Sequence, residues 1–91
     1  MKTIWKVPLY QDMATTSAEL PVGAIPVHVA LQNDTLCIWC RVDTEQPRST
    51  IMFEVIGTGH LEPRGKTYIG SVQRPPFVWH VYYSGPSDEV V

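Results

Sequence analysis

One stretch of the chain decides its fold: IPVHVALQNDTLCIWCRV, residues Ile25 to Val42. Apolar side chains alternate with others from Ile25 to Gln32 and again from Leu36 to Val42, which is the period of a strand with two different faces. Between the two runs stands Asn33-Asp34, a pair that tolerates the left-handed backbone of a tight hairpin turn. The stretch therefore predicts an antiparallel hairpin, and we expect this hairpin to be central to the fold.

The rest of the chain repeats this pattern of short strands separated by turns. Further strands are expected at residues 3–9, 18–22, 51–56, 67–73 and 77–83, with polar loops at 11–17 and 43–49. Pro8 indicates an edge strand or a strand end, and Gly70 indicates a bulge or a close approach of two backbones. No window supports a helix of ordinary length. Six to seven short strands predict an all-β fold, either a small antiparallel sandwich or a partly open barrel.

Composition is typical of a single small globular domain. The chain has 91 residues, of which 44% are hydrophobic and 18% charged, with a formal net charge of −2. We expect one domain over residues 1–91, with an ordered core at about 3–83 and a polar tail at 84–91. The chain has no basic run that would favour duplex nucleic acid, and no apolar run approaches the roughly 20 residues that span a bilayer. Residues 1–6 lack the features of a signal peptide, so a cytoplasmic protein with reduced cysteines is expected.

Alternation divides the strongest strands into two faces. The first face is almost wholly apolar and is expected to form the core: Ile25, Val27, Val29, Leu31, Leu36, Ile38, Cys40, Val42, Ile51, Phe53, Val55, Phe77, Trp79 and Val81. The second face mixes aromatic, cationic and titratable groups: His28, Cys37, Trp39, Arg41, Met52, Glu54, His80 and Tyr82. Tryptophan, tyrosine, methionine and arginine are enriched at protein interfaces. One interpretation of the second face is a partner-binding surface that carries Trp39, Arg41, His28, His80 and Tyr82, and the other is an ordinary solvated sheet face.

The strand expected at residues 51–56 ends in Gly57-Thr58-Gly59-His60. Glycines permit positive φ angles and close backbone approach, so successive N–H groups in such a loop can surround an anion. His60 adds a group that titrates near neutral pH. The loop is either a tight turn or a site for a nucleotide-like ligand whose base would stack on Trp39 or Tyr82. Ligand binding would be accompanied by oligomerisation, because one small domain offers little depth for a pocket.

The spacing of Cys37 and Cys40 is weak evidence for a metal site. Residues i and i+3 of a strand point to opposite faces, and the chain has no second C-x-x-C to complete four zinc ligands. His60 and His80 could complete a set, but packed thiols are the simpler interpretation. The carboxylates are scattered, and no Ser-His-Asp spacing, H-E-x-x-H or Walker motif is present. We therefore expect no enzymatic activity, no metal and no cofactor.

Several pieces of the sequence together resemble one protein family. They are Thr3-Ile4-Trp5-Lys6 with Pro8-Leu9, Pro21-Val22-Gly23-Ala24, His28-Val29 with Gln32, Cys37-Ile38-Trp39 with Val42-Asp43, Phe53 through His60, Tyr68-Ile69-Gly70 with Val72-Gln73, and Trp79-His80-Val81. They resemble a family of small uncharacterised proteins, encoded mostly by bacteriophages and prophages, that share the motifs I-W-K, C-x-W-x-x-V-D, G-T-G-H and W-H-V. The chain departs from that pattern at Ile56, where an aromatic residue is usual, and at Arg41, where a small or apolar residue is common.

This resemblance implies a phage-encoded protein of the host-cell cytoplasm. By analogy with small phage proteins that lack catalytic motifs, we expect a non-enzymatic binding protein that inhibits a host defence or metabolic protein through the aromatic and arginine-bearing face. The alternative is a protein that sequesters a nucleotide-like small molecule at the Gly-Thr-Gly-His loop.

Overall fold

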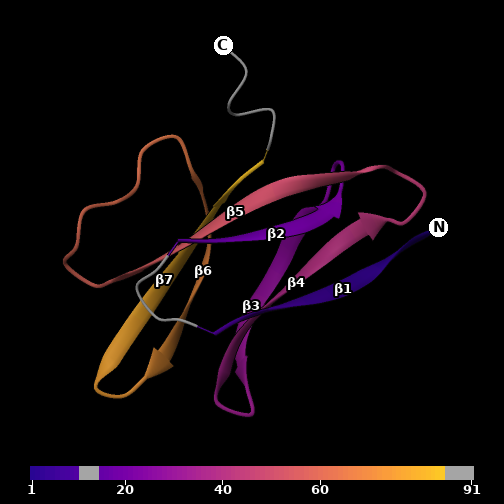
Figure 1. Ribbon diagram of the computed structural model, residues 1–91. Coiled ribbons are helices and arrows are strands. Elements are labelled where there is room, and N and C mark those ends of the chain that lie inside the picture. The colour runs from indigo at the N-terminus through magenta and orange to yellow at the C-terminus, as the bar shows by residue number, and fades with distance from the viewer. Residues whose placement is uncertain (11–14, 86–91) are drawn as a thin grey trace.

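The computed structural model describes residues 1–10 and 15–85, which form seven strands joined by turns (Figure 1). The strands are β1 (Lys2–Leu9), β2 (Thr15–Pro21), β3 (Ile25–Gln32), β4 (Thr35–Asp43), β5 (Arg48–Gly57), β6 (Thr67–Arg74) and β7 (Phe77–Ser84). All neighbouring strands are antiparallel, so the all-β prediction is confirmed. Among these residues, no helix is long and apolar enough to cross a membrane.

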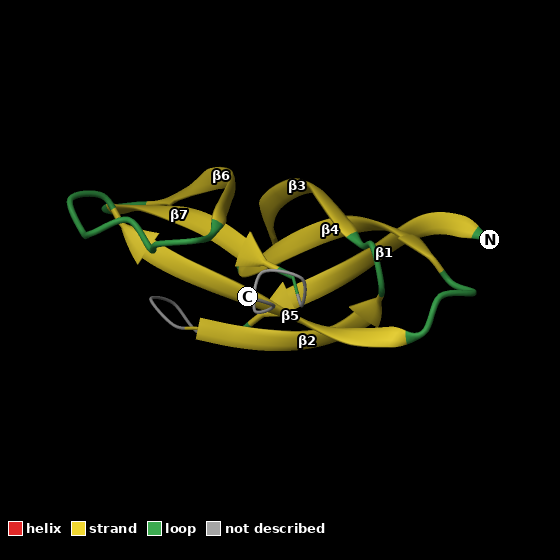
Figure 2. Cartoon of the chain, turned by 90° about the horizontal axis from the view of Figure 1, so that it is seen from above, coloured by secondary structure: helices red, strands yellow, loops and turns green. Residues whose placement is uncertain are grey.

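The strands form two sheets in an open, sandwich-like arrangement. The three-stranded sheet has the order β1-β4-β3, and the four-stranded sheet has the order β2-β5-β7-β6. Figure 2 shows β2 and β5 running below β1 and β4, so that one sheet covers the inner face of the other. Fully buried side chains from both sheets meet in one core, among them Ile38 and Cys40 from β4, Phe53 from β5 and Val81 from β7. Burial of this shared core is the main term that holds the two sheets together.

The predicted hairpin forms with the predicted turn. Asn33 and Asp34 have φ angles of 49° and 65°, and Gln32 pairs with Thr35 across the turn. Positive φ at both central residues is the requirement of a two-residue type I′ hairpin. The hairpin is less central than expected, because β4 is the middle strand of the smaller sheet and β3 is its edge.

A β-bulge in β3 overturns part of the predicted core. Pro26 pairs with Cys40 and His28 pairs with Trp39, which leaves Val27 as an extra residue between them. Because strand side chains alternate with a period of two, one extra residue turns every preceding side chain to the opposite face. Ile25 and Val27 are therefore 49% and 45% exposed instead of buried.

Phe77 also lies outside the predicted core. It is the first residue of β7 and is 56% exposed, although it follows the same alternation as Trp79 and Val81. Its ring stacks on that of Trp79, with ring centroids 5.3 Å apart. Phe77 is thus at the end of the sheet, where one neighbouring ring covers it and the core does not.

Gly70 marks both a bulge and a close backbone approach. The pairing of β6 with β7 shifts register between Tyr68 and Gly70. A Cβ atom at Gly70 would lie only 2.8 Å from Cγ1 of Val29 in β3. The sequence predicts one or the other of these features, and the structure has both. The close approach shows where the edges of the two sheets meet.

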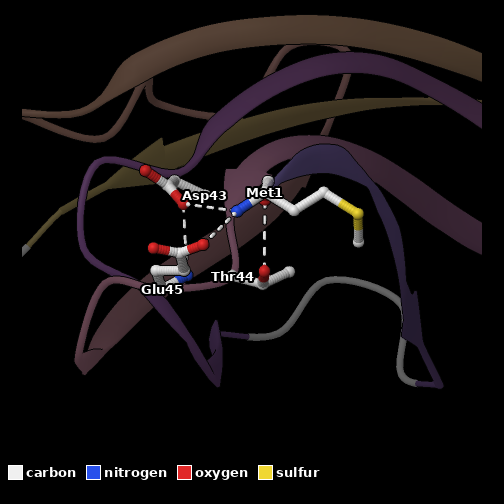
Figure 3. Close-up of polar contacts among 4 residues, drawn as sticks. All are labelled: Met1, Asp43, Thr44 and Glu45. Atoms are coloured by element: carbon white, nitrogen blue, oxygen red, sulfur yellow. Dashed lines mark hydrogen bonds and ion pairs between the residues drawn. The ribbon is translucent and has the colours of Figure 1, made fainter.

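Charged groups hold the start of β1 against the end of β4 (Figure 3). The amine of Met1 lies 3.3 Å from Oδ1 of Asp43 and 3.2 Å from Oε2 of Glu45. The carbonyl of Met1 accepts hydrogen bonds from the backbone N–H and the hydroxyl of Thr44. The Glu45 N–H and the Met1 amine hold the pKa of the Asp43 carboxyl below its ordinary value. These contacts extend the β1–β4 ladder to the pair of Lys2 with Asp43.

Several expected boundaries move by a few residues. The loops predicted at 11–17 and 43–49 are shorter than expected, because β2 already begins at Thr15 and β5 begins at Arg48. Ser84, expected to open the tail, is the last residue of β7. The remaining parts of the predicted first loop and tail, residues 11–14 and 86–91, lie outside the described residues.

Candidate functional site

The outer face of the three-stranded sheet carries side chains in rows. Residues directly opposite each other on antiparallel strands point to the same side of the sheet, so the register shows which side chains are neighbours. From β1 through β4 to β3, the rows are Ile4–Arg41–Ile25, Lys6–Trp39–His28 and Pro8–Cys37–Ala30.

The first two rows contain a cluster that we call the Trp39 face, defined by Ile4, Ile25, His28, Trp39 and Arg41. Trp39 is half-buried, and the ring of His28 lies against it with ring centroids 5.6 Å apart. Arg41 is exposed between Ile4 and Ile25, which are 48% and 49% exposed. Large apolar side chains that remain in water around an arginine and a tryptophan are typical of protein interfaces.

The charges around the Trp39 face are mostly positive. Lys2 and Arg41 have no ion pair within the part of the chain that the structure describes, and the Lys6 ammonium donates to the neutral side chain of Gln32 at 2.7 Å. The nearby Asp43 carboxylate already contacts the Met1 amine. This side of the molecule therefore presents positive charge although the whole chain has a formal net charge of −2.

Part of the outer face of the four-stranded sheet is covered by the chain's own loop, residues 58–66, which contacts the outward-facing side chains of β7. Tyr82 is only 6% exposed, and its hydroxyl donates to Oε2 of Glu62 at 2.8 Å. This hydrogen bond to a carboxylate raises the pKa of Tyr82. Nε2 of His80 lies 2.7 Å from the Thr58 hydroxyl. At the other end of the loop, the Lys66 ammonium donates to the hydroxyl of Ser84 at 2.9 Å.

The structure separates the five residues that were expected to share one binding face. It places His28, Trp39 and Arg41 together on the three-stranded sheet, and it places His80 and Tyr82 on the four-stranded sheet. The five residues therefore belong to the outer faces of two different sheets. His80 and Tyr82 are engaged with the loop, which leaves the Trp39 face as the more accessible candidate.

The sequence matches the family model described as "Domain of unknown function (DUF7352)" over residues 1–90. The chain belongs to this family. No curated protein and no solved structure matches the chain. The matched range includes the Trp39 face, the covering loop and the Gly57–His60 turn.

In this DUF7352 domain, the Gly57–His60 segment is a β-turn. The His60 N–H donates to the Gly57 carbonyl at 3.1 Å, and Gly59 has a φ angle of +94°. A positive φ at the third position of the turn is the requirement of a type II turn and explains glycine there. The His60 amide is used inside the turn and so is not free to bind an anion.

A hollow of about 390 Å³ lies beside this turn. Its walls come from the turn and from the start of β7, and its lining residues are Gly57, Thr58, His60, Pro76, Phe77, Val78 and Trp79. Sequence reasoning found the turn but missed the four residues from Pro76 to Trp79. Tyr82 is not among the lining residues, and Trp39 belongs to the other sheet, so neither is placed to stack a base in this hollow.

The two cysteines lie on opposite faces of β4, as their spacing predicts. Cys37 lies on the outer face between Pro8 and Ala30, and Cys40 lies in the core. Both thiols are free and buried, and burial raises the pKa of Cys40 to about 11. Over residues 1–10 and 15–85, no group of three or more His, Cys, Asp or Glu side chains could hold a metal ion.

Sequence reasoning also missed part of the Trp39 face. Ile25 was assigned to the core, and Ile4 was not selected at all. Pro26 was the available signal for Ile25, since proline inside a strand often accompanies a bulge. Ile4 gave no local signal, because its exposure depends on the outer side of β1 remaining uncovered.

Proposed function

We propose that this protein is a non-enzymatic binding protein that contacts another protein through the Trp39 face. The observation that carries the proposal is the row Ile4–Arg41–Ile25, in which two half-exposed isoleucines flank an arginine that makes no ion pair with other described residues. The Trp39–His28 pair lies in the next row. Aromatic and arginine side chains surrounded by apolar contacts provide most of the binding energy at typical interfaces.

The chemistry of the face selects a type of partner. Ile4 and Ile25 suit an apolar patch, while Lys2, Lys6 and Arg41 suit acidic groups around that patch. The motifs that resemble phage and prophage proteins make a protein of the bacterial host the proposed partner. Inhibition of a host defence or metabolic protein is then the proposed outcome of binding in the host cytoplasm.

Affinity capture from host lysate tests the proposal. The bait proteins are the wild type, the double variant Trp39→Ala/Arg41→Ala and a control variant, Ser71→Ala/Gln73→Ala, whose changes are exposed on the outer face of β6. We expect one host protein to be retained by the wild type and the control and lost by the Trp39/Arg41 variant. Equal capture by all three folded proteins, or capture by none, would contradict the proposal.

A purified partner allows a cleaner measurement. Arg41→Glu reverses an exposed charge without removing packed atoms, so its melting temperature should equal that of the wild type. We expect its affinity for the partner to fall by about tenfold or more, and wild-type affinity to weaken as salt is raised. An affinity that depends on neither Arg41 nor salt would show that binding takes place elsewhere on the molecule.

A further inference from the structure

The hollow beside the Gly57–His60 turn contains an exposed aromatic wall. Phe77 lines it and is 56% exposed, so its ring is accessible from the hollow. The ring of Phe77 stacks on the buried ring of Trp79, with ring planes 30° apart. The absence of a side chain at Gly57 leaves room for the ring of Trp79, since a Cβ atom there would lie 3.3 Å from Cζ3 of Trp79.

Polar groups lie close to the ring of Phe77 in the lining of the hollow. The Thr58 hydroxyl is held in place by Nε2 of His80 at 2.7 Å, and the exposed His60 ring lies over Gly57. Trp79 is 7% exposed, and its indole N–H has no hydrogen-bond partner among the described residues. A buried donor without a partner costs folding free energy, so its presence in the wall of a hollow favours a role in holding an acceptor.

The lining is poorly suited to a phosphate. No lysine or arginine is among the lining residues, and the His60 amide already donates to the Gly57 carbonyl. The volume of about 390 Å³ is at the lower end of the range, roughly 300–1,000 Å³, in which small-molecule sites are found. An uncharged ring is therefore a better match than a nucleotide recognised through its phosphate.

We propose that this hollow binds a flat, uncharged heteroaromatic ring of the nucleobase type. The ring stacks against Phe77, and its polar edge faces the Thr58 hydroxyl and the His60 imidazole. This site lies on the four-stranded sheet and is independent of protein binding by the Trp39 face.

Nuclear magnetic resonance titration of the full chain tests the site. The probes are adenosine and uridine, each compared with its 5′-monophosphate, at up to millimolar concentration. We expect the nucleosides to shift the signals of the Trp79 indole N–H and the Gly59 amide while the Trp39 indole signal stays in place. Each nucleoside and its monophosphate should bind with similar affinity.

Variants of Phe77 provide the structural control. Phe77→Ala should weaken nucleoside binding by about tenfold or more, whereas Phe77→Tyr keeps the ring and should preserve it. Val27→Ala, a change at another exposed apolar side chain on the other sheet, should leave binding unchanged. Absent shifts at millimolar nucleoside, or binding that Phe77→Ala leaves intact, would overturn the proposal. Monophosphates that bind more than tenfold tighter than nucleosides would instead show an anion site.

Discussion

The outer faces of the two sheets carry similar side chains, but these side chains differ in whether other parts of the chain contact them. Each face has a histidine near a large aromatic ring: His28 with Trp39 on the three-stranded sheet, and His80 with Tyr68 on the four-stranded sheet. On the four-stranded sheet, Thr58 and Glu62 from the covering loop contact His80 and Tyr82. Among residues 1–10 and 15–85, no loop makes such contacts with the Trp39 face, and half-exposed isoleucines flank an arginine there.

This difference shows that residue types alone do not identify an interface. Polar side chains that already have a partner in the folded chain must give it up before they can bind another molecule, and this cost offsets the new contact. Side chains without such partners lose only contacts with water, so they bear the costs of desolvation and ordering but keep no competing contact within the chain. The three-stranded sheet is therefore the better candidate for binding, although the sequence patterns of the two faces are alike.

The difference between the two outer faces depends on how the two sheets pack against each other. Of the substitutions considered, Gly70→Ala should disturb this packing most. The new Cβ atom would lie 2.8 Å from Cγ1 of Val29, so either the β3 or the β6 edge has to move. We expect the free energy of unfolding to fall by about 1–3 kcal/mol, as is usual for an overpacked site. Urea denaturation measures the effect.

Val29→Ala is the matched control for Gly70→Ala. Removing the opposing methyl groups should make the Gly70→Ala substitution less harmful, so the double variant should be more stable than the sum of the two single effects predicts. Simple additivity would show that the two edges are not in tight contact at this point.

A substitution in the Gly57–His60 turn should destabilise the covering loop. Gly59→Ala places a side chain at a φ angle of +94°, and we expect a loss of about 1–2 kcal/mol. Gly57→Ala should cost less, because its φ angle is not positive and its Cβ needs only a small shift of Trp79. Hydrogen exchange of residues 58–66 should increase in Gly59→Ala. The outer face of the four-stranded sheet should then be more accessible, as the Trp39 face is.

Gly23→Ala separates strain from loop release. Gly23 has a φ angle of +86° and, like Gly59, open space around the position of a Cβ atom, but it lies in a turn outside the covering loop. It should lower stability by a similar amount and leave hydrogen exchange in the loop unchanged. Equal exchange in the two variants would mean that the loop responds only to overall stability.

The smallest expected effect on stability comes from changing one residue on each outer face. Tyr82→Phe removes the hydrogen bond to Glu62 and should lower the melting temperature by several degrees, whereas His28→Ala should leave it nearly unchanged. Thermal unfolding near neutral pH measures both. A His28→Ala protein that is as destabilised as Tyr82→Phe would mean that His28 also has a structural role.

The pH dependence of Tyr82→Phe sharpens this test. The pKa of Tyr82 is raised above its ordinary value of 10.0, which means that the folded state favours the protonated hydroxyl. Its contribution to stability is therefore complete below pH 10 and is lost as the pH rises through the higher folded-state value. The wild type should lose this increment of stability in that alkaline range, and Tyr82→Phe should not. Parallel alkaline profiles for the two proteins would contradict the assignment.

Local sequence determined the strands and several turns of this protein. Alternation and short apolar runs between turn signals located all seven strands, and Asn33-Asp34 specified the hairpin turn. Gly70 predicted a bulge or a close approach, and the structure has both there. The opposite orientation of Cys37 and Cys40 followed from the strand period alone. The strands, the hairpin turn and the orientation of the cysteines depend on residues that are close in the chain, which is why they can be read from it. Gly70 is informative for another reason, because glycine in a strand is typical of bulges and close backbone approaches whichever segment lies opposite.

Only the tertiary structure decided which side chains form surfaces together. Alternation shows that His28 and His80 are each on the mixed side of a strand, but pairing between distant segments places them in different sheets. The bulge at Val27 turned Ile25 outward, and the loop with Glu62 covered Tyr82. The hollow at Phe77 exists because two turns far apart in the sequence meet at one end of a sheet. Such surfaces are set by non-local pairing and packing, whose partners a local pattern cannot specify.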